Sequence, residues 1–289
     1  MQRISIHVAT RDRHSEVACL LVSLRNQTYQ DWDIVIVDES ETPLDTHVPS
    51  IYLLNRIRQE GHKVYYMRNI MRLGVCHARN ICIDQDHFNN PLALRLDDDV
   101  VPDIDYIEKL VDVIDKGYDI ASGVTPLMSK PEFVRDLSNG FDGIVNRIDV
   151  DNEGNITKFC DDCGYSYDIK FKDIIQGGYK LPLKAVLNSV FPAHCFRSCA
   201  LYKTKITKDG LRYETSLSPV SFREESFFSL RARWEGYKIG VDLSAKVWHF
   251  ITPSGGCRYP NYQELVRQDD ESFRKWLKKM IKSKGGLPK

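Results

Sequence analysis

Three consecutive aspartates, Asp97, Asp98 and Asp99, directly follow the apolar segment 92–96. Neighbouring carboxylates repel one another by on the order of 1 kcal/mol in water, and by several times more at a lower effective dielectric constant. A cation is therefore expected among them, and a hard divalent ion such as Mn²⁺ or Mg²⁺ suits carboxylate ligands and substrate phosphates. Asp97 and Asp99 point the same way in an extended segment, so they can act together. The alternative is a solvated acidic loop at the start of the next helix, where aspartate is favoured.

Two other polar clusters follow apolar segments in the N-terminal part of the chain. Thr-Arg-Asp-Arg at residues 10–13 comes after the alternating segment 4–8, and Asp-Glu-Ser at 38–40 comes after the apolar run 34–37. A continuous apolar run suits a strand that is buried on both faces of a parallel sheet. In such sheets ligands bind at the carboxyl ends of the strands. The sequence thus predicts that these clusters and the three aspartates share one ligand site.

The elements that would position these clusters alternate between strand and helix over the first 125 residues. The periodicities predict strands at 4–8, 34–37, 64–67, 92–96 and 119–124, and helices around 17–24, 48–60, 74–84 and 102–117. We expect Pro102 to open the last helix, Ile104 to lie on its buried face and Gly117 to end it. This alternation predicts an α/β fold with a doubly wound, mainly parallel sheet of Rossmann-like type.

The second half of the chain has a less regular pattern. A hairpin is expected from 145–150 and 156–159, with a further strand at 165–171. A helix over 223–236 and two strands at 239–243 and 246–250 are predicted to follow.

The composition excludes several classes of protein. The 289 residues carry 40 Lys plus Arg and 40 Asp plus Glu, so the formal net charge is zero and a strongly basic nucleic-acid binder is not expected. Hydrophobic residues make up 42% of the chain, which favours a packed core over disorder. No apolar run approaches the roughly 20 residues that span a bilayer. The N-terminus lacks the pattern of a signal peptide, so a cytoplasmic protein is expected.

Six segments together resemble the family 2 glycosyltransferases, which have the GT-A fold. They occur in the family's order: ISIHVATRDR at 4–13, IVIVDES at 34–40, LGVCHARN at 73–80, LRLDDDVVP at 94–102, REESFFSLRARWEGYKI at 223–239 and KVWHF at 246–250. The resemblance implies one GT-A domain over residues 1–252, followed by a basic amphipathic tail over 253–289. Residues 1–125 would bind the nucleotide-sugar, and 126–252 would form the smaller, irregular acceptor side and carry the catalytic base.

The resemblance also implies a role for each matching side chain. The metal, Mn²⁺ or Mg²⁺, would be bound by Asp99, Asp97 and His249. Arg79 would approach the diphosphate, where a guanidinium makes charge-assisted hydrogen bonds. The nucleotide-sugar as a whole would contact Thr10, Arg11, Asp12, Arg13, Asp38, Glu39, Arg79, Asp97 and Asp98. By itself, His249 would equally suit a buried core imidazole.

The catalytic base is expected at the start of the helix over 223–236. The family's usual pair is Glu-Asp with the aspartate as base, whereas this chain has Glu224 and Glu225, so the second carboxylate is one methylene longer. We expect Glu225 to be the base and keep Glu224 as the second candidate. Both glutamates would also favour a helix N-terminus for purely electrostatic reasons.

The implied function is inverting, metal-dependent transfer of a sugar from a nucleotide-diphosphate sugar, with UDP favoured, to a hydroxyl acceptor. One alternative is a nucleotidylyltransferase of related fold, which would want a glycine-rich phosphate loop where residues 10–13 contain none. The other is a non-catalytic binding module, which would lack the base or the metal ligands. The acceptor can be a glycan, a lipid-linked sugar, a protein or a nucleic acid, and the oligomeric state stays open.

Two further features lie outside this site. Cys160, Cys163, Cys195 and Cys199 could form a zinc site, although the gap between the two pairs is long. The tail over 270–289 has apolar residues at helical spacing among many lysines. A peripheral membrane contact is one interpretation, and packing of the apolar stripe against the domain is the preferred one.

Overall fold

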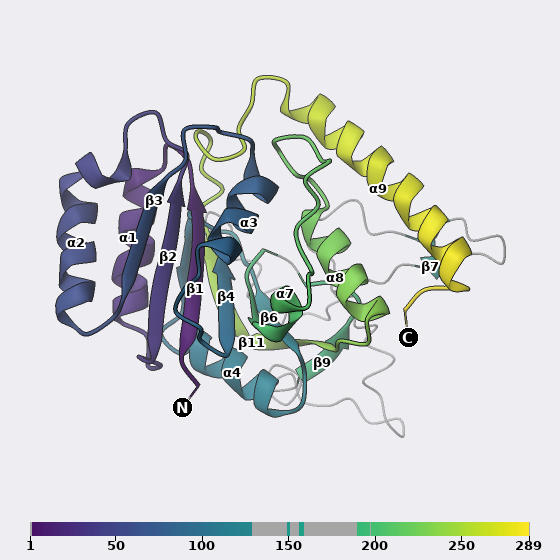
Figure 1. The fold of residues 1–289 in the computed structure, drawn as a ribbon, viewed down its shortest axis with the longest axis horizontal. Helices are drawn as coiled ribbons and strands as arrows, with labels where there is room; N and C mark the ends of the chain where they lie inside the picture. Colours follow the sequence, from purple (N-terminus) through teal and green to yellow (C-terminus); the bar gives the residue numbers. More distant parts are fainter. Residues whose placement is uncertain (1, 129–148, 151–155, 159–189, 197, 289) are drawn as a thin grey trace.

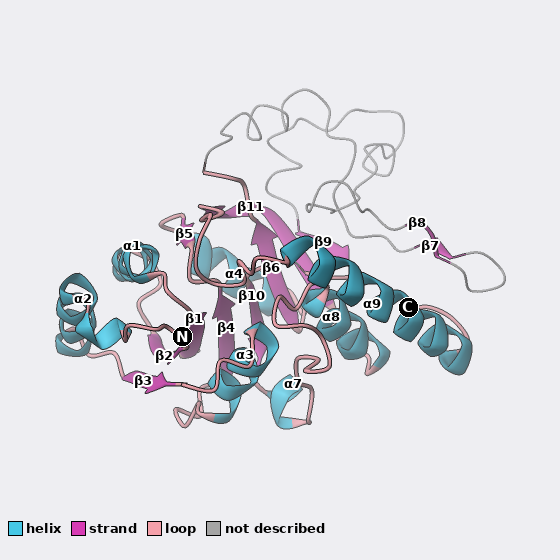
Figure 2. Ribbon diagram, turned by 90° about the horizontal axis from the view of Figure 1, so that it is seen from above, coloured by secondary structure: helices cyan, strands magenta, loops and turns pink. Residues whose placement is uncertain are grey.

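A computed structural model describes residues 2–128, 149–150, 156–158, 190–196 and 198–288. Most of its strands form one curled sheet with the order β3-β2-β1-β4-β10-β6-β11-β5, and β9 pairs with β11 (Figures 1 and 2). The strands are β1 (Ile4–Thr10), β2 (Trp32–Asp38), β3 (Val64–Arg68), β4 (Leu92–Leu96), β5 (Val100–Pro102), β6 (Ile120–Val124), β9 (Val190–Ala193), β10 (Ala200–Lys203) and β11 (Ile239–His249).

The helices cover both faces of this sheet. They are α1 (His14–Arg25), α2 (Val48–Gln59), α3 (Val75–Asp84), α4 (Tyr106–Asp115), α7 (Lys205–Lys208), α8 (Glu224–Trp234) and α9 (Tyr262–Lys284), with a 3-10 turn η1 (Leu44–Thr46). Apolar residues of α1, α2 and α4 pack with Ile6 and Leu94 on one face. Residues of α3 and α8 pack with Val35 and Ala93 on the other. The mixed α/β fold with a mainly parallel sheet is therefore confirmed.

Parallel pairing brings the ends of three strands to one edge. Strand β1 pairs in parallel with both β2 and β4, with Thr10 opposite Asp38 and Val8 opposite Leu96. The polar clusters at residues 10–13, 38–40 and 97–99 therefore leave the sheet side by side, as the sequence predicts.

The helix expected to open at Pro102 begins instead at Tyr106. Pro102 ends the short strand β5, whose partner is the antiparallel β11. A proline suits such an edge strand because it has no N–H to donate. Ile104 was expected on the buried face, but it lies before the helix and is 63% exposed.

The two strands expected at 239–243 and 246–250 form one strand, β11. Its pairing with β6 shifts register between Val241 and Lys246, which explains why the sequence looks interrupted there. Gly123 of β6 lies so close to β11 that an added Cβ would be 2.1 Å from the carbonyl oxygen of Ala245. The glycine therefore allows the two backbones to approach.

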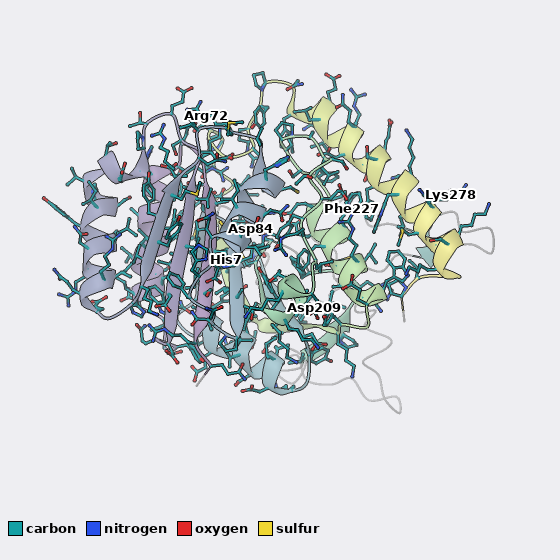
Figure 3. All side chains as sticks on the ribbon, viewed as in Figure 1. His7, Arg72, Asp84, Asp209, Phe227 and Lys278 are labelled. Carbon is teal, nitrogen blue, oxygen red and sulfur yellow. The ribbon has the colours of Figure 1, made fainter. Side chains whose placement is uncertain are left out.

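The C-terminal helix α9 packs its apolar stripe against α8. Phe273, Leu277 and Ile281 are buried together with Phe227 and Leu230. Figure 3 shows Phe227 between the two helices and Lys278 on the outer side of α9. The preferred interpretation of the tail is confirmed, because its apolar face is covered by the protein; the peripheral membrane contact stays a prediction. Within the described ranges, no helix has both the length and the apolar character to cross a bilayer.

Part of the irregular region lies outside the described residues, including the strand expected at 165–171 and the thiols Cys160 and Cys163. Two short strands of the expected hairpin are described. They are β7 (Asp149–Val150) and β8 (Ile156–Lys158), and they pair antiparallel.

Candidate active site

Hydrogen bonds connect the three strand ends directly. Thr10 Oγ1 donates to Asp98 Oδ2 at 2.9 Å. The backbone N–H of Glu39 donates to the carbonyl of Thr10 at 2.8 Å, and that of Asp12 donates to Ser40 Oγ at 2.8 Å. The structure thus brings together residues from all three clusters that the sequence singled out.

Arg13 is the cation that compensates two of the aspartates. Its Nη1 lies 2.8 Å from Asp98 Oδ1 and 3.0 Å from Asp99 Oδ2, and its side chain is only 6% exposed. Burial raises the pKa of Asp98 to about 6, because the desolvation and the neighbouring Asp99 together outweigh the attraction of Arg13. The predicted nucleotide contact Arg13 therefore lies within the acidic cluster itself.

Asp99 also meets His249, the last residue of β11. His249 Nε2 lies 3.0 Å from Asp99 Oδ1. Burial lowers the pKa of His249, but the contact with Asp99 outweighs it and the net shift is upward. The two atoms are at hydrogen-bonding distance, and ligation of a metal by Asp99 and His249 stays a prediction.

The described residues form no complete protein cage for a metal. No group of three or more His, Cys, Asp or Glu side chains suited to a metal ion occurs among the described residues. Mg²⁺ and similar ions commonly take only one or two carboxylates and fill their other positions with water and substrate phosphates. Asp99 and His249 supply one carboxylate and one imidazole for such a site, but Asp99 Oδ2 is also paired with Arg13 at 3.0 Å, which a metal would have to share.

Asp97 has different partners from Asp99. Its Oδ1 accepts from Arg79 Nη2 at 2.7 Å and from Arg95 Nη2 at 3.2 Å, and its Oδ2 accepts from the hydroxyl of Ser198. Burial alone would raise the pKa of Asp97, but Arg95 and Arg79 hold it well below its usual range. Both oxygens are thus engaged by protein donors, and metal ligation by Asp97 stays a prediction.

Arg95 links the acidic cluster to the start of α8. The same Nη2 atom that binds Asp97 lies 2.9 Å from Glu224 Oε1 and 3.1 Å from Glu225 Oε1. Arg95 belongs to β4 and its side chain is only 2% exposed. The guanidinium therefore holds three carboxylates from two separate segments around one nitrogen.

The two glutamates at the start of α8 differ in access. Glu224 is paired with both Arg79 and Arg95, and its side chain is 4% exposed. Glu225 contacts Arg95, and 25% of its side chain is exposed. Burial would raise the pKa of Glu225, but Arg95 and Arg79 lower it below its usual value. Of the two, Glu225 is the more accessible carboxylate.

The predicted nucleotide contacts Asp38, at the end of β2, and Glu39, just after it, already have partners within the protein. Asp38 is fully buried; its Oδ1 accepts from the N–H of Ser40, and its Oδ2 accepts from the N–H of Leu44 and the hydroxyl of Tyr66. Glu39 accepts from Asn69 Nδ2 at 2.7 Å. These carboxylates shape the loop after β2, and their contact with a nucleotide stays a prediction.

The start of α3 is covered by the loop before α8. The N–H of Val75 donates to the carbonyl of Pro219, and the N–H of Cys76 donates to Ser221 Oγ at 3.2 Å. A Cβ added at Gly74, which has φ +102°, would lie 2.5 Å from Pro219 Cα. The first turn of α3 is therefore occupied by the protein's own loop, and the residue of α3 that reaches the acidic cluster is Arg79.

The loop after β11 completes the edge and was missed by the sequence reasoning, because the resemblance ends at residue 252. The N–H of Gly256 donates to the carbonyl of Arg11 at 2.7 Å, and Arg13 Nε donates to the carbonyl of Ser254 at 3.3 Å. The Arg11 guanidinium lies 4.7 Å from the centre of the Tyr259 ring. The Gly255-Gly256 pair is a signal for such a close approach.

Arg95 and Ser198 were also missed. Arg95 had a signal, since it is the one charged residue in the apolar segment Leu-Ala-Leu-Arg-Leu. Ser198 had none, because its approach to Asp97 depends on the packing of the segment before β10.

The described cysteines do not gather into a site. Cys195 is buried beside Phe227, whereas Cys199 lies in the main core cluster. Burial raises the pKa of the Cys195 thiol to about 12 and also raises that of Cys199.

Comparison with known proteins identifies the family of this chain. The family model described as "Glycosyl transferase family 2" matches residues 5–170, more than half of the chain. The chain belongs to this family of glycosyl transferases. No curated protein matches the sequence.

Solved structures of glycosyltransferases resemble this family member in fold. TarS of S. aureus is 15% identical with a TM-score of 0.53, and the match covers 95% of this chain and 42% of TarS. GalNAc-T7, solved with UDP, GalNAc and Mn²⁺, is 13% identical with a TM-score of 0.63, and the match covers 99% and 56%. The mannosyltransferase PcManGT of Pyrobaculum calidifontis, solved with GDP-Man and Mn²⁺, is 13% identical with a TM-score of 0.55 over 98% and 74%. The chain thus spans about half the length of TarS and GalNAc-T7, and the GT-A fold is confirmed.

Proposed function

We propose that this protein transfers a sugar from a nucleotide-diphosphate sugar to a hydroxyl acceptor, with inversion at the anomeric carbon and with the help of a divalent metal. The observation that carries the proposal is the position of Arg95. One nitrogen of its side chain lies 3.2 Å from Asp97 and 3.1 Å from Glu225. The acidic strand end and the proposed base are therefore close enough to act on the two sides of one sugar.

Glu225 is the proposed general base. Its carboxylate takes the proton of the acceptor hydroxyl as that oxygen forms a bond to the anomeric carbon. The bond from the anomeric carbon to the diphosphate breaks, and its electron pair leaves with the diphosphate. The lowered pKa of Glu225 keeps the base ionised at neutral pH, and a single displacement of this kind inverts the configuration.

Glu224 has a supporting place in this proposal. Its carboxylate is held by Arg79 and Arg95 and is nearly inaccessible, so it orients the two guanidinium groups. Arg79 is the proposed diphosphate contact. It already binds Asp97 at 2.7 Å, so a diphosphate would have to share this arginine.

A divalent metal would be held by Asp99 and His249, with Asp97 as the further predicted ligand. Bound there, it would offset the negative charge of the departing diphosphate. Five carboxylates (Asp97, Asp98, Asp99, Glu224 and Glu225) contact three guanidinium groups in this cluster. When His249 is neutral, as a metal ligand must be, two formal negative charges are left, which a divalent cation would balance. Two of the similar structures were solved with Mn²⁺.

The donor is proposed to be a UDP-sugar that lies along the strand ends of β1, β2 and β4. Thr10, Arg11 and Asp12 line this edge. One similar structure was solved with UDP and another with GDP-Man, so the test must include both nucleotides.

The test is hydrolysis and transfer with a panel of UDP- and GDP-sugars, with Mn²⁺, Mg²⁺ or a chelator. We expect metal-dependent turnover of at least one donor, and metal-dependent binding of its nucleotide. Absence of both turnover and metal-dependent nucleotide binding across the panel would rule out the transferase. Nucleotide binding without turnover, in the presence of acceptors of each class, would favour a binding module.

A further inference from the structure

The segment that leads into α8 has an unusual backbone. In this base loop, residues 218–223, Ser221 has φ +57° and Arg223 has φ +72°. Side chains disfavour this left-handed region, and such residues persist only where their surroundings hold them there. Glu224 and Glu225 follow directly, so the conformation of the base loop decides where the proposed base points.

Asp269, on helix α9, holds the base loop by its backbone. Its Oδ1 accepts from the N–H of Ser218 at 2.7 Å, and its Oδ2 accepts from Ser218 Oγ at 2.7 Å and from the N–H of Phe222 at 2.8 Å. The residue is 2% exposed, so the carboxylate is enclosed by the loop that it binds. These bonds join segments about 50 residues apart in sequence.

The next residue of α9 repeats the contact. Asp270 Oδ1 lies 2.7 Å from Arg223 Nε, and its Oδ2 lies 2.7 Å from Arg274 Nε. One turn further, the Phe273 ring meets Phe227 of α8 edge to face, with centroids 5.1 Å apart. Helix α9 is thus fixed to α8 by apolar packing, and this packing fixes the position of Asp269.

The opposite side of the base loop contacts α3. Pro219 and Ser221 accept the first backbone N–H groups of that helix, and α3 carries Arg79. The base loop therefore lies between Asp269 and the helix that carries the proposed diphosphate contact.

We propose that Asp269 is a positioning residue for transfer: it holds the base loop in the strained conformation that points Glu225 at the acceptor. The inference rests on the proposed function, since it assigns a catalytic consequence to this contact. It gives α9, which lies beyond the family match, a part in the reaction. Small displacements of a catalytic group cost large factors in rate.

The experiment compares Asp269→Asn, Asp269→Ala and Ser218→Ala with Glu271→Gln, an exposed acidic residue on the same helix, as the control. Ser218→Ala removes one of the three bonds and serves if the Asp269 variants do not fold. With the donor found active in the panel, we expect kcat to fall at least tenfold for Asp269→Ala and less for the other two. The KM for the donor should stay unchanged, because Arg79 is held by Asp97 independently of the base loop. The control should retain wild-type kcat. An unchanged kcat in folded Asp269→Ala and Asp269→Asn overturns the proposal.

A second measurement separates this inference from the proposed function. Amide hydrogen exchange in residues 216–225 should be faster in Asp269→Ala than in wild type, while exchange in β1 and β4 stays the same. Equal protection in the base loop overturns the inference even if transfer is confirmed. If exchange in the base loop is faster in Asp269→Ala but the wild-type protein transfers no sugar from any donor of the panel, the contact is confirmed and the proposed function is refuted, and with it the catalytic consequence of the contact.

Discussion

The two sides of the site are held in different ways. On the donor side, Thr10 ends the strand β1, and Asp98 and Asp99 come soon after β4. Contacts between these neighbouring parallel strand ends hold them. On the base side, Glu225 begins a helix, and the groups that hold it come from β4 and, through the base loop, from α9. The donor side therefore depends on the sheet, whereas the base side depends on segments that are distant in sequence.

Replacement of the proposed base should give the largest effect, because it should lower the rate of transfer without changing binding of the nucleotide on the donor side. For Glu225→Gln we expect kcat to fall by roughly 10²–10⁴-fold, the usual contribution of a general base, while nucleotide affinity stays near that of wild type. Steady-state transfer and calorimetric nucleotide binding measure the two effects. Glu235→Gln, an exposed position at the end of the same helix, is the control. A variant that transfers normally would show that Glu225 is not the base.

The dependence of the base side on α9 can be tested through its packing. Phe273 is fully buried between α9 and α8, so Phe273→Ala should lower the free energy of unfolding by about 3–5 kcal/mol. Denaturant unfolding measures this change. Lys275→Ala, on the exposed side of α9, should change stability by less than about 0.5 kcal/mol. A loss below about 1 kcal/mol for Phe273→Ala would mean that α9 contributes little to the base side.

The donor side can be tested through the metal. Asp99→Asn and His249→Ala should each weaken Mn²⁺ binding by at least about 10–100-fold, the range seen when even an outer partner of a metal ligand is lost. Calorimetric titration with Mn²⁺ in the presence of the nucleotide measures the affinity. Asp112→Asn, on the exposed face of α4, should bind Mn²⁺ as wild type does. Unaltered Mn²⁺ affinity in both site variants would show that the metal does not bind at Asp99 and His249.

The smallest effect on stability is expected for a surface ion pair that lies on neither the donor side nor the base side of the site. Glu60 binds Arg25 and Arg56, and these hydrogen bonds lower its pKa to about 2. A lowered pKa stabilises the fold above the pKa of the unfolded chain, about 4.3, and the contribution is lost as the pH falls towards 2. Glu60→Gln should lower the free energy of unfolding by less than about 1 kcal/mol at pH 7, and by less at pH 3.5. Urea unfolding at both pH values checks this, and a larger loss at pH 3.5 would contradict it.

Much of the donor side was predictable because strand periodicity and the polar residues after each strand are local signals. The strands β1, β2 and β4 and the helix α1 lie where these signals place them. The start of α4 was not predictable, because Pro102 is also compatible with an edge strand and pairing with β11 decided the outcome. The sequence shows Arg95 only as a charged residue in an apolar strand. Its carboxylate partners could not be predicted, because two of them lie about 130 residues away in the chain.

The sequence alone determined the alternation of strands and helices, the family, and the side chains that could do chemistry. Tertiary structure alone decided how the five carboxylates are divided: Arg13 and His249 take Asp99, while Arg95 joins Asp97 to Glu225. It also decided that the apolar stripe of α9 packs against α8 and that Asp269 reaches the base loop. The physical reason is that periodicity records only which face of an element is buried. The partner of a buried charge is set by whichever opposite charge the fold brings within hydrogen-bonding distance, whatever their separation along the chain.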